Sequence, residues 1–334
     1  MHLYKIVFLN TMVLGTLLSI SSYSWFSMWM GLEINMLSII PLFSSTKNMF
    51  ASEAATKYFM TQALASLILL LSININFIEN EIMNFNNMES LMLNSALLTK
   101  LGSAPFHVWF PEVIEGLSWL NSLLLLTWQK IAPMVLIMNS NMNHNLMNMA
   151  IISSLLVSGA MALNQTSLRK IMAFSSINHI AWMLAATLAE SSNWSLYFTI
   201  YSLISINLIM ILNSNKLFFL NQLSNTMTNN KNVKLSLSLN FLSLGGIPPL
   251  LGFLPKWLLI NSLIEKKMLL ITWTLIMATL IMLFVYVQIM MPAIVMDQAE
   301  LKTAMESKIN WNLQAFNSII TNTLIFCILI YTLM

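Results

Sequence analysis

Apolar residues run along this chain in long stretches that short polar segments interrupt. A helix needs about 20 mainly apolar residues to cross the roughly 30 Å hydrocarbon core of a membrane. With that length as a guide, the sequence predicts eleven spans and therefore an all-α polytopic membrane protein. The predicted spans cover residues 3–21, 25–44, 54–75, 91–110, 119–139, 146–163, 171–189, 194–213, 235–264, 269–292 and 315–334.

Two of the predicted spans contain helix-breaking residues. The fourth contains Gly102-Ser103-Ala104-Pro105. The ninth is too long for one straight helix and contains Gly245-Gly246-Ile247-Pro248-Pro249 and Leu254-Pro255. Irregular backbone persists at membrane depth only where protein or a water-filled cavity surrounds it. Both spans are therefore expected to be broken helices with a protected polar site at the break.

The two breaks are five spans apart, which predicts two units of five helices followed by one extra helix. The units would cover residues 1–140 and 146–292, with the extra helix at 315–334, in a single membrane domain of residues 1–334. Because five is an odd number, the second unit would be inverted relative to the first. Inverted repeats with interrupted helices are typical of transporters, whose sites lie at the breaks.

The composition agrees with a membrane protein, since 57% of the 334 residues are hydrophobic and 8% are charged. A soluble domain carries about 25% charged residues, so this chain has too few to cover a soluble globule of its size. A single cysteine, Cys327, excludes an internal disulfide and an iron–sulfur cluster held by this chain alone. The 28 methionines and few glycines are typical of an AT-rich organelle genome.

The basic residues predict the orientation of the spans, because Lys and Arg concentrate on the inner side of a membrane. Placing the N-terminus inside puts ten of the 15 basic residues, Lys57 among them, on the inner side and only Lys266 and Lys267 outside. The other three lie within spans. The predicted outer loop at residues 76–90 carries three glutamates and no basic residue, which agrees with this orientation. Eleven spans then place the C-terminus outside.

Four charged residues lie well inside the predicted spans, away from their ends: Glu33, Lys100, Lys130 and Lys256. A charge at the membrane centre has a high free-energy cost, so it rarely persists without a role. A lysine exchanges protons near neutral pH only where burial lowers its pKa well below about 10.4. The alternative for each lysine is that its long side chain reaches back to the lipid headgroups. Pro133, close to Lys130, is expected to kink the fifth span.

Two further expectations concern charge pairing and proton relay. Glu33 lies near the centre of the second span and is expected to pair with Lys100, either as a switch or as a static ion pair. His179 lies in the seventh span with serines and an asparagine close by. Imidazole titrates near pH 6.5, which suits a relay, although a hydrogen-bonded packing histidine fits the same pattern equally well. The candidate proton-carrying residues are Glu33, Lys100, Lys130, His179 and Lys256.

Several other functions lack their sequence signals. The chain has no glycine-rich nucleotide loop, no metal-spaced cluster of His, Cys and Glu, and no nucleophile paired with a base. No basic stripe indicates nucleic-acid binding. We therefore expect no cofactor, metal or nucleic acid on this chain and an ion pathway as its chemistry.

Five motifs occur in order along the chain: Met30–Asn35, Lys100–Trp109, Asn164–Lys170, Phe174–His179 and Gly245–Phe253. As a set they resemble the antiporter-like subunits in the membrane arm of mitochondrial NADH–ubiquinone oxidoreductase, respiratory complex I. The resemblance covers essentially the whole chain. Eleven spans are similar to the shortened animal form of these subunits, and the methionine-rich composition is similar to an insect mitochondrial gene.

The resemblance implies a core subunit of the proton-pumping NADH:ubiquinone oxidoreductase, hence part of an enzyme without a redox centre of its own. It implies proton translocation through Glu33, Lys100, Lys130 and Lys256, with His179 on the hydrophilic axis between the halves. NADH, FMN, iron–sulfur clusters and ubiquinone would bind other subunits. The expected partners are other subunits of the complex, especially neighbouring antiporter-like ones, and lipids such as cardiolipin. The expected location is the mitochondrial inner membrane, with the N-terminus in the matrix and the C-terminus in the intermembrane space.

Two other functions fit the buried charges. A free-standing cation/proton antiporter would work alone, whereas a subunit would co-migrate with its complex on a native gel. An assembly scaffold with static charges would keep wild-type pumping when Glu33, Lys130 and Lys256 are neutralised one at a time.

Overall fold

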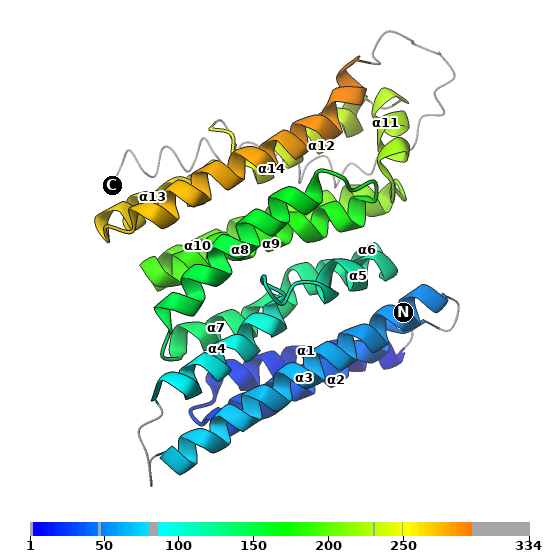
Figure 1. The fold of residues 1–334 in the computed structure, drawn as a ribbon. Helices are drawn as coiled ribbons and strands as arrows, with labels where there is room; N and C mark the ends of the chain where they lie inside the picture. Colours follow the sequence, from blue (N-terminus) through cyan, green and yellow to red (C-terminus); the bar gives the residue numbers. More distant parts are fainter. Residues whose placement is uncertain (1–2, 46–47, 80–85, 230, 249, 296–334) are drawn as a thin grey trace. The chain divides into compact units, whose positions relative to one another are not determined.

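The computed structural model describes residues 3–45, 48–79, 86–229, 231–248 and 250–295. This part of the chain is helical, and it divides into two compact units, Met1–Ser154 and Leu155–Met334 (Figure 1). The helices are α1 (Leu3–Ser21), α2 (Trp25–Phe43), α3 (Met49–Glu79), α4 (Asn86–Leu101), α5 (Trp109–Gly116), α6 (Trp119–Leu126), the 3-10 helix η1 (Trp128–Lys130), α7 (Ile131–Asn139), α8 (His144–Ala162), α9 (Leu168–Ala189), α10 (Ser191–Ser214), α11 (Leu220–Asn229), α12 (Lys231–Gly245), α13 (Phe253–Glu265) and α14 (Leu269–Val295).

Eight helical segments of the described part are long and apolar enough to cross a membrane: α1, α2, α3, the α6–α7 segment, α8, α9, α10 and α14. The fourth and ninth predicted spans are each split, into α4 and α5 and into α12 and α13. The expected all-α membrane fold with two broken helices is therefore confirmed. The eleventh span, residues 315–334 with Cys327, lies outside the described residues, so the count of eleven stays a prediction.

The first break runs over residues 102–108. Gly102 has a φ of +75°, a conformation that glycine adopts far more readily than other residues. Its N–H donates hydrogen bonds to the carbonyls of Leu98 and Thr99, and α4 ends there. The fourth span was predicted to end at residue 110, but α5 carries it to Gly116. The prediction stopped too early because the two glutamates of α5 lower its apolar content.

The second break lies between the end of α12 at Gly245 and the start of α13 at Phe253. Gly246 has a φ of +81°. A Cβ atom on Gly252 would lie 1.7 Å from the carbonyl oxygen of Ser243, so the chain crosses the end of α12 where no side chain fits. Pro255, which was expected to interrupt the helix, instead lies in the first turn of α13, where proline lacks no helical hydrogen bond.

The fifth span is distorted where the sequence predicted it. Pro133 has no N–H for the carbonyl of Gln129, and its ring crowds that oxygen. The helix accordingly ends at Leu126, tightens into the 3-10 turn η1 and resumes as α7. Lys130 is the last residue of that turn.

The loop predicted at residues 76–90 is shorter than expected, because α3 continues to Glu79 and α4 begins at Asn86. The Asn76 amide donates a hydrogen bond to the Glu89 carboxylate. This contact joins the end of α3 to the first turns of α4, both of which lie in residues that hydropathy alone assigns to a loop.

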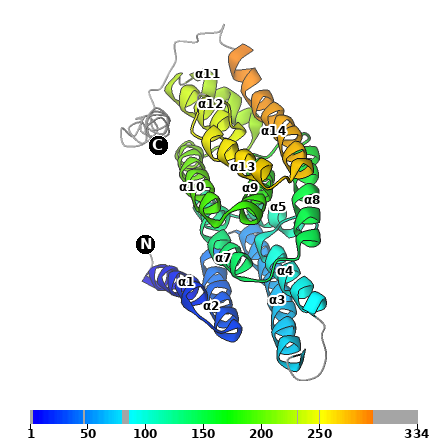
Figure 2. The ribbon, with the colours of Figure 1, turned by 90° about the vertical axis from the view of Figure 1, so that its left-hand side faces the viewer.

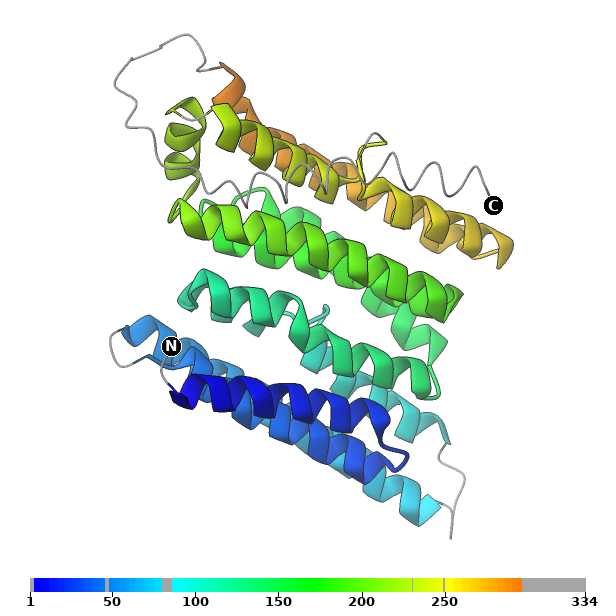
Figure 3. The same cartoon turned by 180° about the vertical axis from the view of Figure 1, so that it is seen from behind.

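α1 and α2 form an antiparallel hairpin (Figure 3) whose backbones are in direct contact. A Cβ atom on Gly31 would lie 2.6 Å from the Ser19 nitrogen and 2.9 Å from the Gly15 carbonyl oxygen. A Cβ atom on Gly15 would lie 2.8 Å from the Asn35 nitrogen. Small residues allow such close helix approach in membranes. The pair Gly15 and Gly31 therefore sets the position of α2, the helix that carries Glu33.

In the second unit, α9 is the central helix. It packs against α10, α13 and α14, which surround it in Figure 2. Buried residues make up 94% of its membrane span, a far larger share than in any other span of the described part. Polar side chains on α9 therefore face protein rather than lipid.

The Asn164–Lys170 motif fastens the start of α9 to the connection between α10 and α11. The Leu168 N–H donates to the Phe218 carbonyl at 2.9 Å, and the Leu220 N–H donates to the Thr166 carbonyl at 3.1 Å. The guanidinium of Arg169 lies 5.0 Å from the centre of the Phe218 ring. Together these bonds form an isolated antiparallel β-bridge between Ser167 and Phe219, the only β-bridge within the described residues.

We predict that Gly31→Ala destabilises the protein by about 1–3 kcal/mol, because the new methyl group must push two helix backbones apart. The measurement is the midpoint temperature of thermal unfolding of the purified protein. Gly159→Ala is the matched control, since its Cβ would meet only the exposed Ile281 side chain, at 3.3 Å. Equal midpoints for Gly31→Ala and the wild type would contradict the close-contact account.

Candidate functional site

The three lysines inside the predicted spans are buried. Lys100 is 8% exposed, Lys130 is 1% exposed and Lys256 is 6% exposed. A lysine that reached back to the headgroups would be exposed along much of its length. The burial of all three side chains therefore contradicts the alternative in which they reach back to the lipid headgroups.

Lys100 lies in the last turn of α4, directly before the first break. It lines a cavity in the first unit that has room for about one water molecule, and we call this the first cavity. Polar side chains from three other helical segments share its wall: Asn35, Tyr58, Gln62 and Gln129.

A chain of hydrogen bonds between neutral groups lines the first cavity. The Tyr58 hydroxyl donates to Oε1 of Gln129 at 3.2 Å, and Nε2 of Gln129 donates to Oδ1 of Asn35 at 2.8 Å. Nε2 of Gln62 donates to the backbone carbonyl of Lys100 at 3.4 Å. These groups can offer hydrogen bonds to a water or an ammonium without adding a fixed charge. Sequence reasoning did not single them out, although each is a polar residue in an apolar span.

Lys130 lies one residue beyond Gln129, on the 3-10 turn. Its ammonium is 6.0 Å from the centre of the Phe110 ring on α5. That distance is at the outer limit of a cation–π contact. In the first unit, Gln129 therefore lines the cavity of Lys100, and Lys130 is the next residue along the chain.

Glu33 is half-buried on α2. Within the described part of the chain, its carboxylate and the Lys100 ammonium do not come within the 4.0 Å of an ion pair. A longer-range Coulombic interaction between the two groups remains. The expected Glu33–Lys100 pair is therefore open in this structure.

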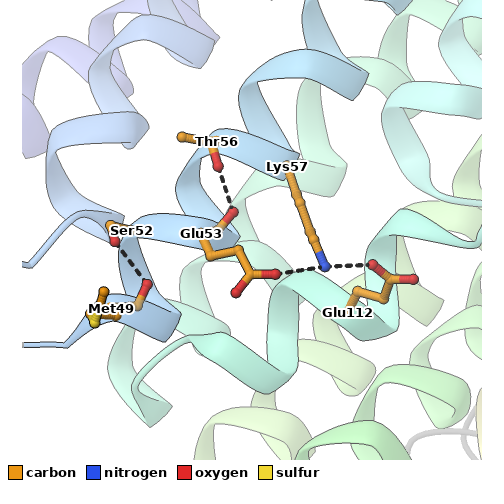
Figure 4. A network of polar contacts seen from close by, with 6 residues as sticks. All are labelled: Met49, Ser52, Glu53, Thr56, Lys57 and Glu112. Atoms are coloured by element: carbon orange, nitrogen blue, oxygen red, sulfur yellow. Dashed lines mark hydrogen bonds and ion pairs between the residues drawn. The ribbon is translucent and has the colours of Figure 1, made fainter.

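The close ion pairs of the first unit gather at Lys57 instead (Figure 4). Its ammonium lies 3.1 Å from Glu53 and 2.9 Å from Glu112. All three side chains are at least 43% exposed, so solvent screens these pairs and they contribute little to stability. The cluster links α3 to α5, the second half of the broken helix.

Lys256 is held by backbone atoms. Its ammonium donates to the carbonyl oxygens of Leu244 at 3.1 Å and Gly245 at 2.9 Å, and it lies 5.7 Å from the centre of the Trp182 ring. We call these two carbonyls the α12 carbonyl site. They belong to the end of a helix, where unpaired carbonyls carry partial negative charge.

His179 is 4% exposed on α9. Its Nδ1 atom shares a 2.8 Å hydrogen bond with the Tyr197 hydroxyl, and its ring centre lies 4.9 Å from that of Tyr201. All three residues line a second cavity, which also has room for about one water molecule. Leu244 lines this cavity as well, so His179 and Lys256 lie beside the same helix end.

The predicted site residues therefore fall into two groups, each within one unit. Glu33, Lys100 and Lys130 belong to the first unit, and His179 and Lys256 belong to the second. Tyr197 is an addition to the second group that the sequence did not reveal. Over the described ranges, no group of three or more His, Cys, Asp and Glu side chains could hold a metal ion.

Known proteins resemble this chain along nearly its full length. Residues 22–283 match the family described as NADH:quinone oxidoreductase/Mrp antiporter, transmembrane. NADH-ubiquinone oxidoreductase chain 2 of Anopheles gambiae is 45% identical over 98% of this chain and 98% of its own length. The corresponding chain 2 of Locusta migratoria is 43% identical over 87% of this chain and 86% of its own.

Solved structures share the fold at lower identity. A chain of respiratory complex I from Thermus thermophilus superposes with a TM-score of 0.83 at 20% identity, covering 96% of this chain and 77% of its own. A chain of the Mrp complex from Dietzia gives a TM-score of 0.74 at 16% identity, covering 84% of this chain and 59% of its own. The chain therefore belongs to the NADH:quinone oxidoreductase/Mrp antiporter family and, within it, to the chain 2 subunits of NADH-ubiquinone oxidoreductase.

Proposed function

We propose that this chain is a proton-translocating subunit in the membrane arm of the H⁺-translocating NADH–ubiquinone oxidoreductase. Glu33, Lys100, Lys130, His179 and Lys256 are its proposed proton-carrying residues. The observation that carries this assignment is the burial of all three lysines, two of them at helix breaks. A buried ionisable residue in a membrane helix, with polar partners and space for water, is typical of a proton relay.

Glu33 and Lys100 form the proposed switch. An ion pair at about 4 Å in a medium of effective dielectric constant about 20 is worth about 4 kcal/mol. Moving one charge through 100 mV costs about 2.3 kcal/mol. The Coulombic free energy of a close pair is therefore comparable with that of one such transfer. Quinone reduction in another subunit would close or open the pair, and the lack of a close Glu33–Lys100 contact in the structure argues against a static bond.

The remaining residues would pass the proton onward. The hydrogen-bonded chain from Tyr58 through Gln129 to Asn35 offers groups that both donate and accept beside Lys100. Lys130 follows Gln129 directly. In the second unit, His179 lines the second cavity together with Leu244, whose carbonyl accepts a hydrogen bond from Lys256, and this proximity supports exchange between the two residues.

The proposal includes location, partners and symmetry. The protein would lie in the mitochondrial inner membrane with its N-terminus in the matrix and its C-terminus in the intermembrane space, as the distribution of basic residues favours. Other subunits would bind NADH, FMN, the iron–sulfur clusters and ubiquinone. Neighbouring antiporter-like subunits and cardiolipin would contact its apolar surface. Residues 1–140 and 146–292 would be inverted repeats, with one helix at 315–334.

We predict that Lys100→Met abolishes proton translocation by this subunit and lowers the coupled redox activity in part, because methionine keeps the length of the side chain but carries no proton. The measurement is the number of protons moved per electron by the assembled complex. Lys57→Met is the control, since it removes an exposed lysine and should leave that number unchanged. If assembled Lys100→Met moves as many protons per electron as the wild type, the proposal is wrong.

A native gel separates the proposal from a free-standing antiporter. The wild-type chain should migrate with the other subunits of NADH–ubiquinone oxidoreductase. Migration as a free, active antiporter would favour the rival function.

We predict that His179→Gln slows proton translocation by about 100-fold or more, the usual order for loss of a general acid–base group. Glutamine can keep a hydrogen bond to Tyr197 but does not titrate. The measurement is the translocation rate of complexes matched for assembly. If the rate stays at the wild-type value, His179 is a packing residue.

A further inference from the structure

The α12 carbonyl site binds the Lys256 ammonium, and Gly246, the next residue along the chain, leaves room for the lysine side chain. Gly246 comes directly after Gly245 and has a φ of +81°. We propose that Gly246 is a positioning residue for Lys256, and this inference rests on the proposed function of Lys256.

The space above Gly246 is filled by Lys256. A Cβ atom on Gly246 would lie 2.9 Å from Cδ, 3.0 Å from Nζ and 3.2 Å from Cε of that lysine. All three distances fall below ordinary van der Waals contact, so any larger residue displaces the end of the lysine chain. The displaced ammonium would lose the carbonyls of Leu244 and Gly245.

The α12 carbonyl site gives the Lys256 ammonium two hydrogen-bond acceptors. The last carbonyls of a helix have no partner within the helix, and Lys256 supplies hydrogen bonds to two of them. Hydrogen bonds from a charged donor are stronger than those from a neutral one. Contact with these oxygens therefore fixes the position of the ammonium beside Leu244, which also lines the second cavity.

The first break provides a comparison for Gly246. Gly102 also has a positive φ, of +75°, but a Cβ atom there would meet the Phe110 side chain at 3.1 Å rather than a lysine. Both glycines adopt a positive φ at a helix end. Only at Gly246 does a candidate proton carrier fill the space that a side chain would take. Combining Gly246→Ala with Lys256→Ala keeps the backbone cost and removes the clash, so the two effects can be separated.

A double-mutant cycle in the intact complex tests the inference. Gly246→Ala, Lys256→Ala and the double variant are compared for protons moved per electron and for the pH dependence of the translocation rate. Lys256→Ala removes every atom that the new methyl group would meet. We expect Gly246→Ala to lower the ratio as far as Lys256→Ala does and to alter the pH dependence, and we expect the double variant to lose nothing further.

Other outcomes are equally definite. Losses that add in the double variant, or no loss in Gly246→Ala while Lys256→Ala is impaired, would overturn the positioning role alone. A wild-type ratio in Lys256→Ala would overturn the proposed function of Lys256 itself. If Gly246→Ala fails to assemble, an assembled double variant supports the clash with Lys256, and a double variant that also fails shows a backbone role instead. Gly159→Ala is the control and should match the wild type.

Discussion

A buried ammonium group must find oxygen atoms or water to replace its hydration, and this constraint organises both units of the protein. A continuous helix has no backbone carbonyl to spare, because each accepts a hydrogen bond from its own ladder. A broken helix has several unpaired backbone carbonyls at the break. Lys100 and Lys256 both lie at breaks, and glycines with positive φ at the two helix ends make those breaks possible.

The two breaks compensate their lysines differently. Around Lys100 the polar atoms come from side chains, in a chain from Tyr58 through Gln129 to Asn35. Around Lys256 they come from the end of α12. Side-chain amides can rotate and exchange partners, whereas two backbone carbonyls hold the ammonium in one position. Under the proposed function, this difference suits a first unit that responds to a change of charge at Glu33 and a second unit that works when its lysine leaves the helix end.

Hydropathy and helix-breaking residues predicted the spans of the described residues, the two breaks and the burial of the lysines, because each depends on local composition. Contacts between distant residues were not predictable in this way. Buried serines, asparagines and glutamines occur in most of the spans, so nothing local distinguishes Gln129 or Tyr197 from the others. The ten-residue helix α11 was not expected, because it is too short and too polar to resemble a span. The open Glu33–Lys100 pair likewise depends on how α2 packs against its neighbours.

The central claim is that the buried lysines are joined by water and exchange protons. A structure of the intact complex at a resolution that shows ordered water tests it most directly. The account predicts water in the first cavity in contact with Lys100 and Gln129, and water in the second cavity between His179 and the α12 carbonyl site. Dry cavities, with apolar side chains sealing each lysine from its polar neighbours, would contradict it.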